Sequence, residues 1–210
     1  FFTGLPLLFA FPFGVVGAIL LIVVLLYSSA MISGSEVAYF SLTPNELAQL
    51  EEENDSVSNQ LVALHYQPRT LLATILIANN FINIAITLIS NYLISEVFSD
   101  VLFVQSAQSF LQSDSYLSVA EKFNFQVSVK AVSNAFRFAL VVVGVTFLLV
   151  LFGEVAPKIY AKINNIKLAK TMAVPLNILI KILRPFSRLL VRGTNVIENK
   201  LVGEGQSNVT

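Results

Sequence analysis

Three long apolar stretches dominate the pattern of hydrophobic and polar positions along the chain. They cover residues 13–42, 71–95 and 136–152. Residues 13–32 and 71–95 contain no charged side chain, and the third stretch contains none after Arg137. A helix needs roughly 20 apolar residues to cross about 30 Å of hydrocarbon. The pattern therefore predicts an all-α membrane protein with three transmembrane helices.

The segments between these spans are polar. The sequence Thr43-Pro44-Asn45-Glu46 is typical of a helix start, with proline in the first turn and an acid close behind it. A single polar helix is expected from about Asn45 to Tyr66, and its run of glutamates places it in water. Residues 96–135 form a loop too long for a tight turn, so we expect small helices within it.

Residues 168–192 are open to two interpretations. The segment is apolar enough for a fourth span, but it contains two prolines and several Lys and Arg residues. Each of these charges costs about 3 kcal/mol at the centre of a membrane helix. A basic amphipathic belt helix along the membrane surface is therefore favoured over a fourth span. Residues 193–210 are polar and are expected to form a linker.

Composition and charge distribution refine this picture. Hydrophobic residues make up 55% of the 210-residue chain and charged residues only 12%, whereas soluble domains have about 25% charged residues. The chain has no cysteine, which excludes disulfides and thiolate metal sites. No basic residue precedes the first span, so a cleavable signal peptide is not expected there.

The positions of the basic residues predict the orientation. Nine of the thirteen Lys and Arg residues follow residue 152, and the positive-inside rule places this C-terminal cluster in the cytoplasm. With three spans, the N-terminus and the loop at 96–135 are then outside. The basic cluster suits anionic lipid head groups better than nucleic acid, so the lipid bilayer is an expected partner and nucleic acid is not.

Polar side chains form one cluster in or at the edge of each span. Serine, threonine and asparagine in spans often only join helices, and that reading stays open here. Membrane-embedded acids are costly and point to function. The atoms in these clusters that could bind a metal are all oxygens, which suits Mg²⁺, Ca²⁺ or Na⁺ rather than zinc or copper. The clusters consist of Ser33, Ser35 and Glu36, then Asn79 and Asn83, and finally Gly153 and Glu154.

Pro157 adds a backbone argument to the third cluster. Proline has no N–H to donate to the carbonyl four residues earlier, which belongs to Gly153. If the helix continues past Pro157, that carbonyl is released and must find another partner or line a cavity. No catalytic triad, phosphate-binding glycine loop or zinc-ligand spacing occurs in the sequence, so an enzyme is not expected.

Three of these stretches carry a family resemblance. They are SGSEVAYFSLTPNEL (residues 33–47), LLATILIANNFIN (71–83) and FGEVAPKIYA (152–161), supported by AKTMAVPLNILIKILRP (169–185). In combination they resemble the transmembrane domain of the CorC/CNNM family of magnesium transporters. The sequence is most similar to the GldE-like gliding motility-associated branch of Bacteroidetes.

The resemblance implies a bacterial inner-membrane homodimer whose transmembrane domain covers residues 1–192, with residues 193–210 leading toward a pair of CBS domains outside this sequence. It implies Mg²⁺ transport, by export coupled to Na⁺. The implied Mg²⁺ ligands are Ser33, Ser35, Glu36, Asn79, Asn83, Gly153 and Glu154.

Two departures from the family pattern suggest an alternative function. Many members have glycine where this chain has Ala78, which adds a methyl group close to the expected ion path. The external loop at 96–135 is also long for the family. The alternative is therefore a membrane scaffold in a gliding motility or secretion apparatus, binding a periplasmic partner through this loop.

Overall fold

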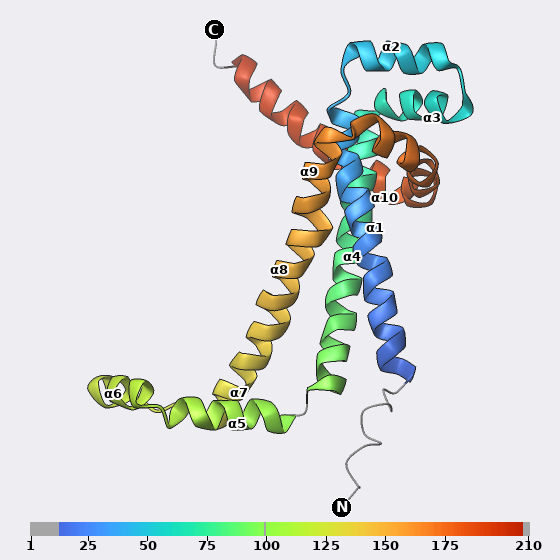
Figure 1. Ribbon diagram of the computed structural model, residues 1–210. Coiled ribbons are helices and arrows are strands. Elements are labelled where there is room, and N and C mark those ends of the chain that lie inside the picture. The colour runs from blue at the N-terminus through green and yellow to red at the C-terminus, as the bar shows by residue number, and fades with distance from the viewer. Residues whose placement is uncertain (1–12, 99, 208–210) are drawn as a thin grey trace, which may run out of the picture. The chain divides into compact units, whose positions relative to one another are not determined.

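The computed structural model describes residues 13–98 and 100–207, with side chains described through Val191. Every element in this part of the chain is helical (Figure 1). The elements are α1 (Phe13–Phe40), α2 (Pro44–Glu53), α3 (Ser56–His65), α4 (Pro68–Val97), α5 (Asp100–Leu111), α6 (Asp114–Phe123), α7 (Val129–Phe138), η1 (Ala139–Val145), α8 (Thr146–Leu148), η2 (Leu149–Val155), α9 (Ala156–Ile163) and α10 (Asn165–Ser207).

Three helical stretches of the described chain are long and apolar enough to cross a membrane. They are Phe13–Phe40, Pro68–Val97 and the continuous run Val129–Ile163. Large apolar side chains along them are exposed, with Leu20 at 62%, Leu88 at 66% and Phe147 at 64%. A water-soluble fold does not leave such contiguous apolar surface uncovered. The prediction of an all-α membrane protein with three spans is thereby confirmed.

The third span is wider than an ordinary α-helix in two places. η1 and η2 are π-helical, and η2 ends two residues before Pro157, after which α9 continues. The helix thus continues past the proline. Short π-helical stretches inside α-helices occur frequently at functional sites, and η2 contains Gly153 and Glu154.

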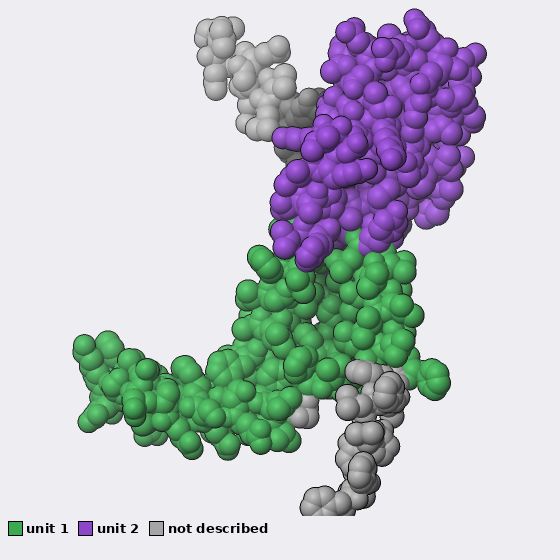
Figure 2. All heavy atoms as spheres, in the orientation of Figure 1, with its two compact units in different colours: residues 1–26, 84–150 green, residues 27–83, 151–210 purple. Residues whose placement is uncertain are grey.

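Contacts divide the chain into two compact units, coloured separately in Figure 2. Unit 1 comprises residues 1–26 and 84–150, and unit 2 comprises residues 27–83 and 151–210. Each predicted polar cluster falls in unit 2. The segment expected as a loop, 96–135, falls in unit 1.

In unit 2 the segment expected to form one polar helix folds as two, α2 and α3. The chain turns at Asn54, whose φ of 48° is left-handed, and Asp55 then caps α3 through the backbone N–H groups of Val57 (2.7 Å) and Ser58 (2.9 Å). Asparagine tolerates this conformation and aspartate is a strong N-cap. The single-helix prediction is wrong because the turn lets both helices bury leucines, among them Leu50 and Leu61.

The start of α2 agrees with the sequence. The Thr43 hydroxyl oxygen accepts a hydrogen bond from the backbone N–H of Glu46, and the Glu46 carboxylate accepts one from the backbone N–H of Thr43. This reciprocal pair is a capping box. Thr43-Pro44-Asn45-Glu46 is therefore confirmed as a helix start.

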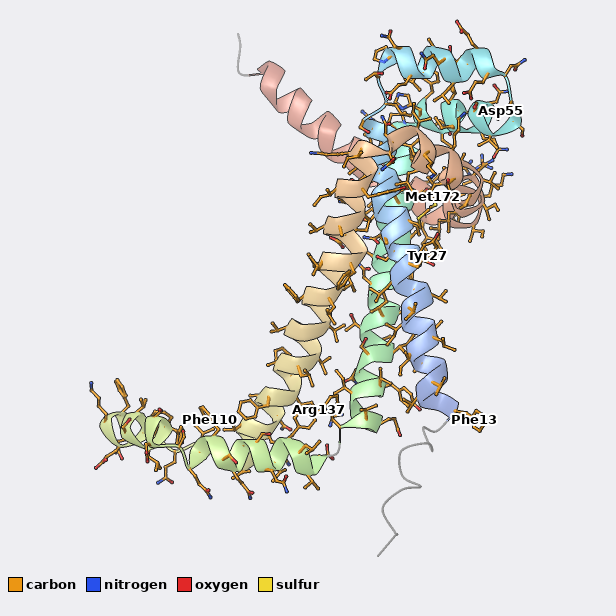
Figure 3. The ribbon with its side chains drawn as sticks, viewed as in Figure 1. Phe13, Tyr27, Asp55, Phe110, Arg137 and Met172 are labelled. Carbon is orange, nitrogen blue, oxygen red and sulfur yellow. The ribbon has the colours of Figure 1, made fainter. Side chains whose placement is uncertain are left out.

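The core of unit 2 joins α1, α2, α3, α4, α9 and α10. Met172 of α10, labelled in Figure 3, is buried in it, and the Tyr39 hydroxyl donates to the carbonyl of Ala169 at 3.2 Å. Gly34 allows α1 to approach closely: a β-carbon there would lie 3.0 Å from the Leu168 side chain and 3.3 Å from the Pro157 carbonyl oxygen. This close approach holds the Ser33–Glu36 segment against the first helical turn of α9, which contains Pro157.

Helix α10 contains Pro175 and Pro185 within its length and is helical through Ser207. Its sequence covers the segment predicted as a belt helix and continues into the segment predicted as a linker. Among the described helices, α10 is not one of those apolar enough to span a membrane. The fourth-span interpretation therefore gains no support.

Unit 1 shows that the long segment 96–135 has helices of its own, as expected: α5, α6 and the first part of α7. Helix α5 packs on α7. Arg137 forms an ion pair with Asp100 at 3.2 Å and also donates to Ser95. The ring of Phe110, labelled with Arg137 in Figure 3, makes a tilted contact with the ring of Tyr116 and an edge-to-face contact with that of Phe136. Aromatic contacts and one surface ion pair therefore hold this segment together.

Candidate functional site

One face of α1 supplies the first set of polar groups. Ser29, Ser33 and Glu36 follow one another at spacings of four and three residues, so they lie on the same side of the helix. Ser29 is fully buried and Ser33 is 2% exposed. Glu36 lies one turn further toward the end of the span and is partly exposed.

Ser29 is bonded to the asparagines of α4. Its hydroxyl lies 2.9 Å from Asn79 Oδ1 and 3.1 Å from Asn83 Oδ1, and the two amide oxygens share its single O–H donor. The two asparagines are four residues apart and share a helix face. Their amide groups therefore stand one above the other beside the serine.

Glu154 completes this network from the π-helical stretch η2. Its Oε1 accepts hydrogen bonds from Asn83 Nδ2 at 3.2 Å and from Asn79 Nδ2 at 3.4 Å. One carboxylate, two amides and one hydroxyl from three helices are thus connected within unit 2. A carboxylate in a low-dielectric environment is costly unless such donors surround it.

Ser33 differs from its neighbours because its buried hydroxyl oxygen has no hydrogen-bond partner among the described residues. Leaving a buried hydroxyl unsatisfied costs about 1–3 kcal/mol. The side chain lines a cavity of about 660 Å³ that we call the polar cavity. A buried, unsatisfied hydroxyl on a residue that lines a cavity of this size calls for an explanation, and a ligand that accepts its lone pair supplies one.

The polar cavity also contains an ion pair. Lys158 Nζ lies 3.0 Å from Glu36 Oε2, and both side chains are about two-fifths exposed, at 40% and 37%. Lys158 follows Glu154 by four residues and shares its helix face. With Arg69, the cavity wall carries two carboxylates and two basic groups. The full lining is Ser33, Glu36, Arg69, Leu72, Ala73, Ile75, Leu76, Asn79, Asn80, Glu154, Lys158, Leu190 and Val191.

Not every residue expected at the site is brought there. Ser33, Glu36, Asn79 and Glu154 line the polar cavity, and Asn83 is bonded to Glu154 beside it. Gly153 is buried next to Glu154 but does not line the cavity.

Ser35 lies apart from this group. It is fully buried, donates to the carbonyl of Ile32 in its own helix at 2.6 Å and does not line the cavity. Ala78 is 5% exposed and packs in the hydrophobic core of unit 2. Its extra methyl group therefore does not enter the polar cavity.

Sequence reasoning missed Ser29, Lys158 and Arg69. The helical spacing contained a signal for the first two: Ser29 precedes Ser33 by four residues, and Lys158 follows Glu154 by four. Arg69 had no such signal, because its place beside α1 and α9 depends on packing between distant segments. Groups of three or more His, Cys, Asp or Glu that could hold a metal do not occur among the described residues.

Comparison with family models agrees with a membrane fold of this kind. Comparison with individual curated proteins gives no significant match. The family described as the Cyclin M transmembrane N-terminal domain (CNNM) matches residues 20–210, which is nearly the whole chain. Such domains are transporter-type membrane domains associated with divalent cations. The chain is therefore a membrane protein that belongs to the CNNM transmembrane domain family.

Proposed function

We propose that this chain transports Mg²⁺ across the membrane through the polar cavity. The observation that carries the proposal is the buried, unpartnered hydroxyl of Ser33, a residue that lines the same cavity as Glu36, Asn79 and Glu154. Magnesium prefers about six oxygen ligands at short distances. Hydroxyl, amide and carboxylate oxygens from α1, α4 and η2 supply such a set. Gly153 adds a carbonyl oxygen if the wider π-helical turn directs it inward.

A change of partners at the two asparagines would admit the cation. Without the cation, the amide nitrogens of Asn79 and Asn83 donate to Glu154 and their oxygens accept from Ser29. A cation takes over the role of the amide N–H groups at the carboxylate. Rotating the amides then turns their oxygens toward the ion. Before the ion binds, the polar side chains of the site hydrogen-bond to one another except at Ser33, where the ion completes the coordination.

The direction and setting of transport are part of the same proposal. Family resemblance supports export coupled to Na⁺, which also prefers oxygen ligands. The distribution of basic residues supports an inner-membrane protein with a cytoplasmic C-terminus. The large exposed apolar area of the spans supports a homodimer, in which part of that surface packs against a second copy.

Binding of Mg²⁺ is tested by thermal unfolding of the purified chain with increasing MgCl₂. Wild type should gain stability with Mg²⁺, because a ligand that binds only the folded state stabilises it. Asn83→Ala and Glu154→Ala should respond weakly. Asn91→Ala, on the same helix but away from the cavity, is the matched control. Equal responses in all four proteins would refute the site.

A scaffold role is the second candidate, and exposed apolar side chains in unit 1 favour it. Phe123 is 67% exposed, Val101 60% and Leu117 51%, on the helices α5 and α6 that precede the third span. We propose that this surface binds a periplasmic protein of a gliding motility or secretion apparatus. Replacing residues 100–127 by a short linker should then abolish a specific cross-link in cells while sparing Mg²⁺ binding. Unchanged cross-links would overturn this role.

A further inference from the structure

A second cavity in unit 2 has the opposite chemistry. It measures about 640 Å³ and lies between the start of α4 and the middle of α10. We call it the basic pocket. Its lining consists of Gln67, Thr70, Ile180, Lys181, Arg184, Ser187, Arg188 and Val191.

The basic pocket carries three positive charges and no carboxylate. The described side chains form no ion pair or hydrogen bond with Lys181, Arg184 or Arg188. By contrast, Lys158 is paired with Glu36 and Lys170 with Glu53 elsewhere in unit 2. Three unneutralised cations around one hollow attract an anion, and arginine matches the oxygens of a phosphate group.

One wall of the pocket is fixed by buried polar contacts. Ser187 is 1% exposed, and its hydroxyl lies 3.0 Å from that of Thr74 on α4. The Thr74 hydroxyl in turn donates to the carbonyl of Thr70 at 2.8 Å. This chain of contacts joins α10 to the first turns of α4. The basic side chains are therefore held beside the end of a membrane span.

The depth of the pocket selects the kind of anion. Helix α4 begins at Pro68 and its apolar span starts directly after it, so residues 67–70 lie at the height of the lipid head groups. On α10, Ile178, Ile182 and Phe186 are spaced by four residues and are 51%, 64% and 55% exposed. They form an apolar stripe beside the basic residues, which is the pattern of a helix lying in the membrane interface.

We infer that the basic pocket binds the phosphate of an anionic phospholipid head group, while the apolar stripe of α10 contacts the acyl chains of the same leaflet. A lipid satisfies both surfaces at once. A free phosphate satisfies only the pocket. A zwitterionic lipid brings its own positive charge toward three others and is disfavoured.

Native mass spectrometry of the purified chain in neutral detergent tests this inference. The protein is titrated with dioctanoyl phosphatidylglycerol, with dioctanoyl phosphatidylcholine and with inorganic phosphate. Phosphatidylglycerol should bind about tenfold or more tightly than either alternative. Each basic residue near an anionic lipid contributes about fivefold, so Arg184→Gln with Arg188→Gln should weaken phosphatidylglycerol binding by about 30-fold.

The double variant Lys162→Gln with Lys167→Gln is the matched control. It loses the same charge from two exposed lysines of unit 2 that line neither cavity, and it should keep wild-type binding. Equal loss in both double variants would mean diffuse attraction and would overturn the site. Equal binding of phosphatidylcholine, or of inorganic phosphate, would overturn the assignment to an anionic lipid. Native mass spectrometry separates folded from unfolded protein by charge state, so loss of the fold is distinguished from loss of the site. The substituted arginines are also exposed.

Discussion

Two cavities of similar size in unit 2 have opposite chemistry. The polar cavity, at about 660 Å³, contains two carboxylates, two basic groups and an unpartnered hydroxyl. The basic pocket, at about 640 Å³, contains three basic groups and no carboxylate. Val191 lines both, and consecutive residues of α4, Arg69 and Thr70, line one each. A site suited to cations therefore adjoins one suited to anions near the start of α4.

The two cavities differ in whether their charged side chains have partners. In the polar cavity Lys158 forms an ion pair with Glu36, and Glu154 accepts hydrogen bonds from two amides. Among the described residues, the Ser33 hydroxyl is the buried group left without a hydrogen-bond partner. In the basic pocket, three positively charged side chains have no carboxylate among the lining residues. Substitutions in one cavity should therefore leave ligand binding at the other cavity unchanged.

The largest effect is expected from Glu154→Gln. Losing the charge that accepts both amide hydrogen bonds should weaken Mg²⁺ binding by about 100-fold, or ~3 kcal/mol. Phosphatidylglycerol binding should stay within about twofold of wild type, since Glu154 does not line the basic pocket. Isothermal titration calorimetry and native mass spectrometry measure the two affinities. Glu96→Gln on α4 is the control, and a parallel loss of lipid binding would break the separation of the cavities.

Ser33→Ala should have effects of opposite sign on stability and binding. Removing a buried, unsatisfied hydroxyl should stabilise the Mg²⁺-free protein by ~1 kcal/mol. The same change removes a ligand and should weaken Mg²⁺ binding by about tenfold. Thermal unfolding with and without MgCl₂ measures both. Ser35→Ala, which breaks a hydrogen bond within α1, should instead lower stability. If Ser33→Ala destabilises the Mg²⁺-free protein, the hydroxyl has a structural partner.

Lys158→Met should tighten Mg²⁺ binding. The ammonium group competes with the cation for Glu36, but both side chains are about two-fifths exposed, so solvent screening limits the pair to ~1 kcal/mol or less. We expect about a fivefold gain in affinity by calorimetry. Lys158→Arg keeps the charge and should stay near wild type. Weaker binding in Lys158→Met would show that the lysine positions Glu36 for the cation.

The smallest effect concerns acid, and it arises outside both cavities. Hydrogen bonds from Lys170 and Ser58 lower the pKa of Glu53, and bonds from Ser58 lower the pKa of Asp55. Carboxyls with lowered folded-state pKa values stabilise the fold above their unfolded values, about 4.3 and 3.9, and lose this contribution as pH falls through the folded values. A modest loss of thermal stability is therefore expected below about pH 4.5.

The test of this acid effect compares wild type with Glu53→Gln across pH 3 to 7. Glutamine cannot ionise, so the variant should lose part of the acid dependence. An unchanged acid dependence would show that Glu53 is not responsible and would leave Asp55 as the group to test next.

Much of this protein was readable from local sequence. The three spans follow from their length and lack of charge, and the start of α2 follows from Thr43 and Glu46, because such features depend on neighbours only a few residues apart. The choice of oxygen donors was also local. Ser33 and Ser35 could not both face one cavity, since residues two apart point to different sides of a helix. The structure places Ser33 at the cavity and turns Ser35 to its own backbone.

The tertiary structure decided which faces meet. It paired Ser29 with Asn79 and Asn83 and Lys158 with Glu36, and it placed Thr70 beside the basic side chains of α10. The turn at Asn54 belongs here too, because burying leucines from both α2 and α3 favours two short helices over one. The sequence by itself determined the elements and their chemistry. Packing between segments far apart in the chain determined which polar groups found partners and which, like Ser33 and the basic pocket, were left without one.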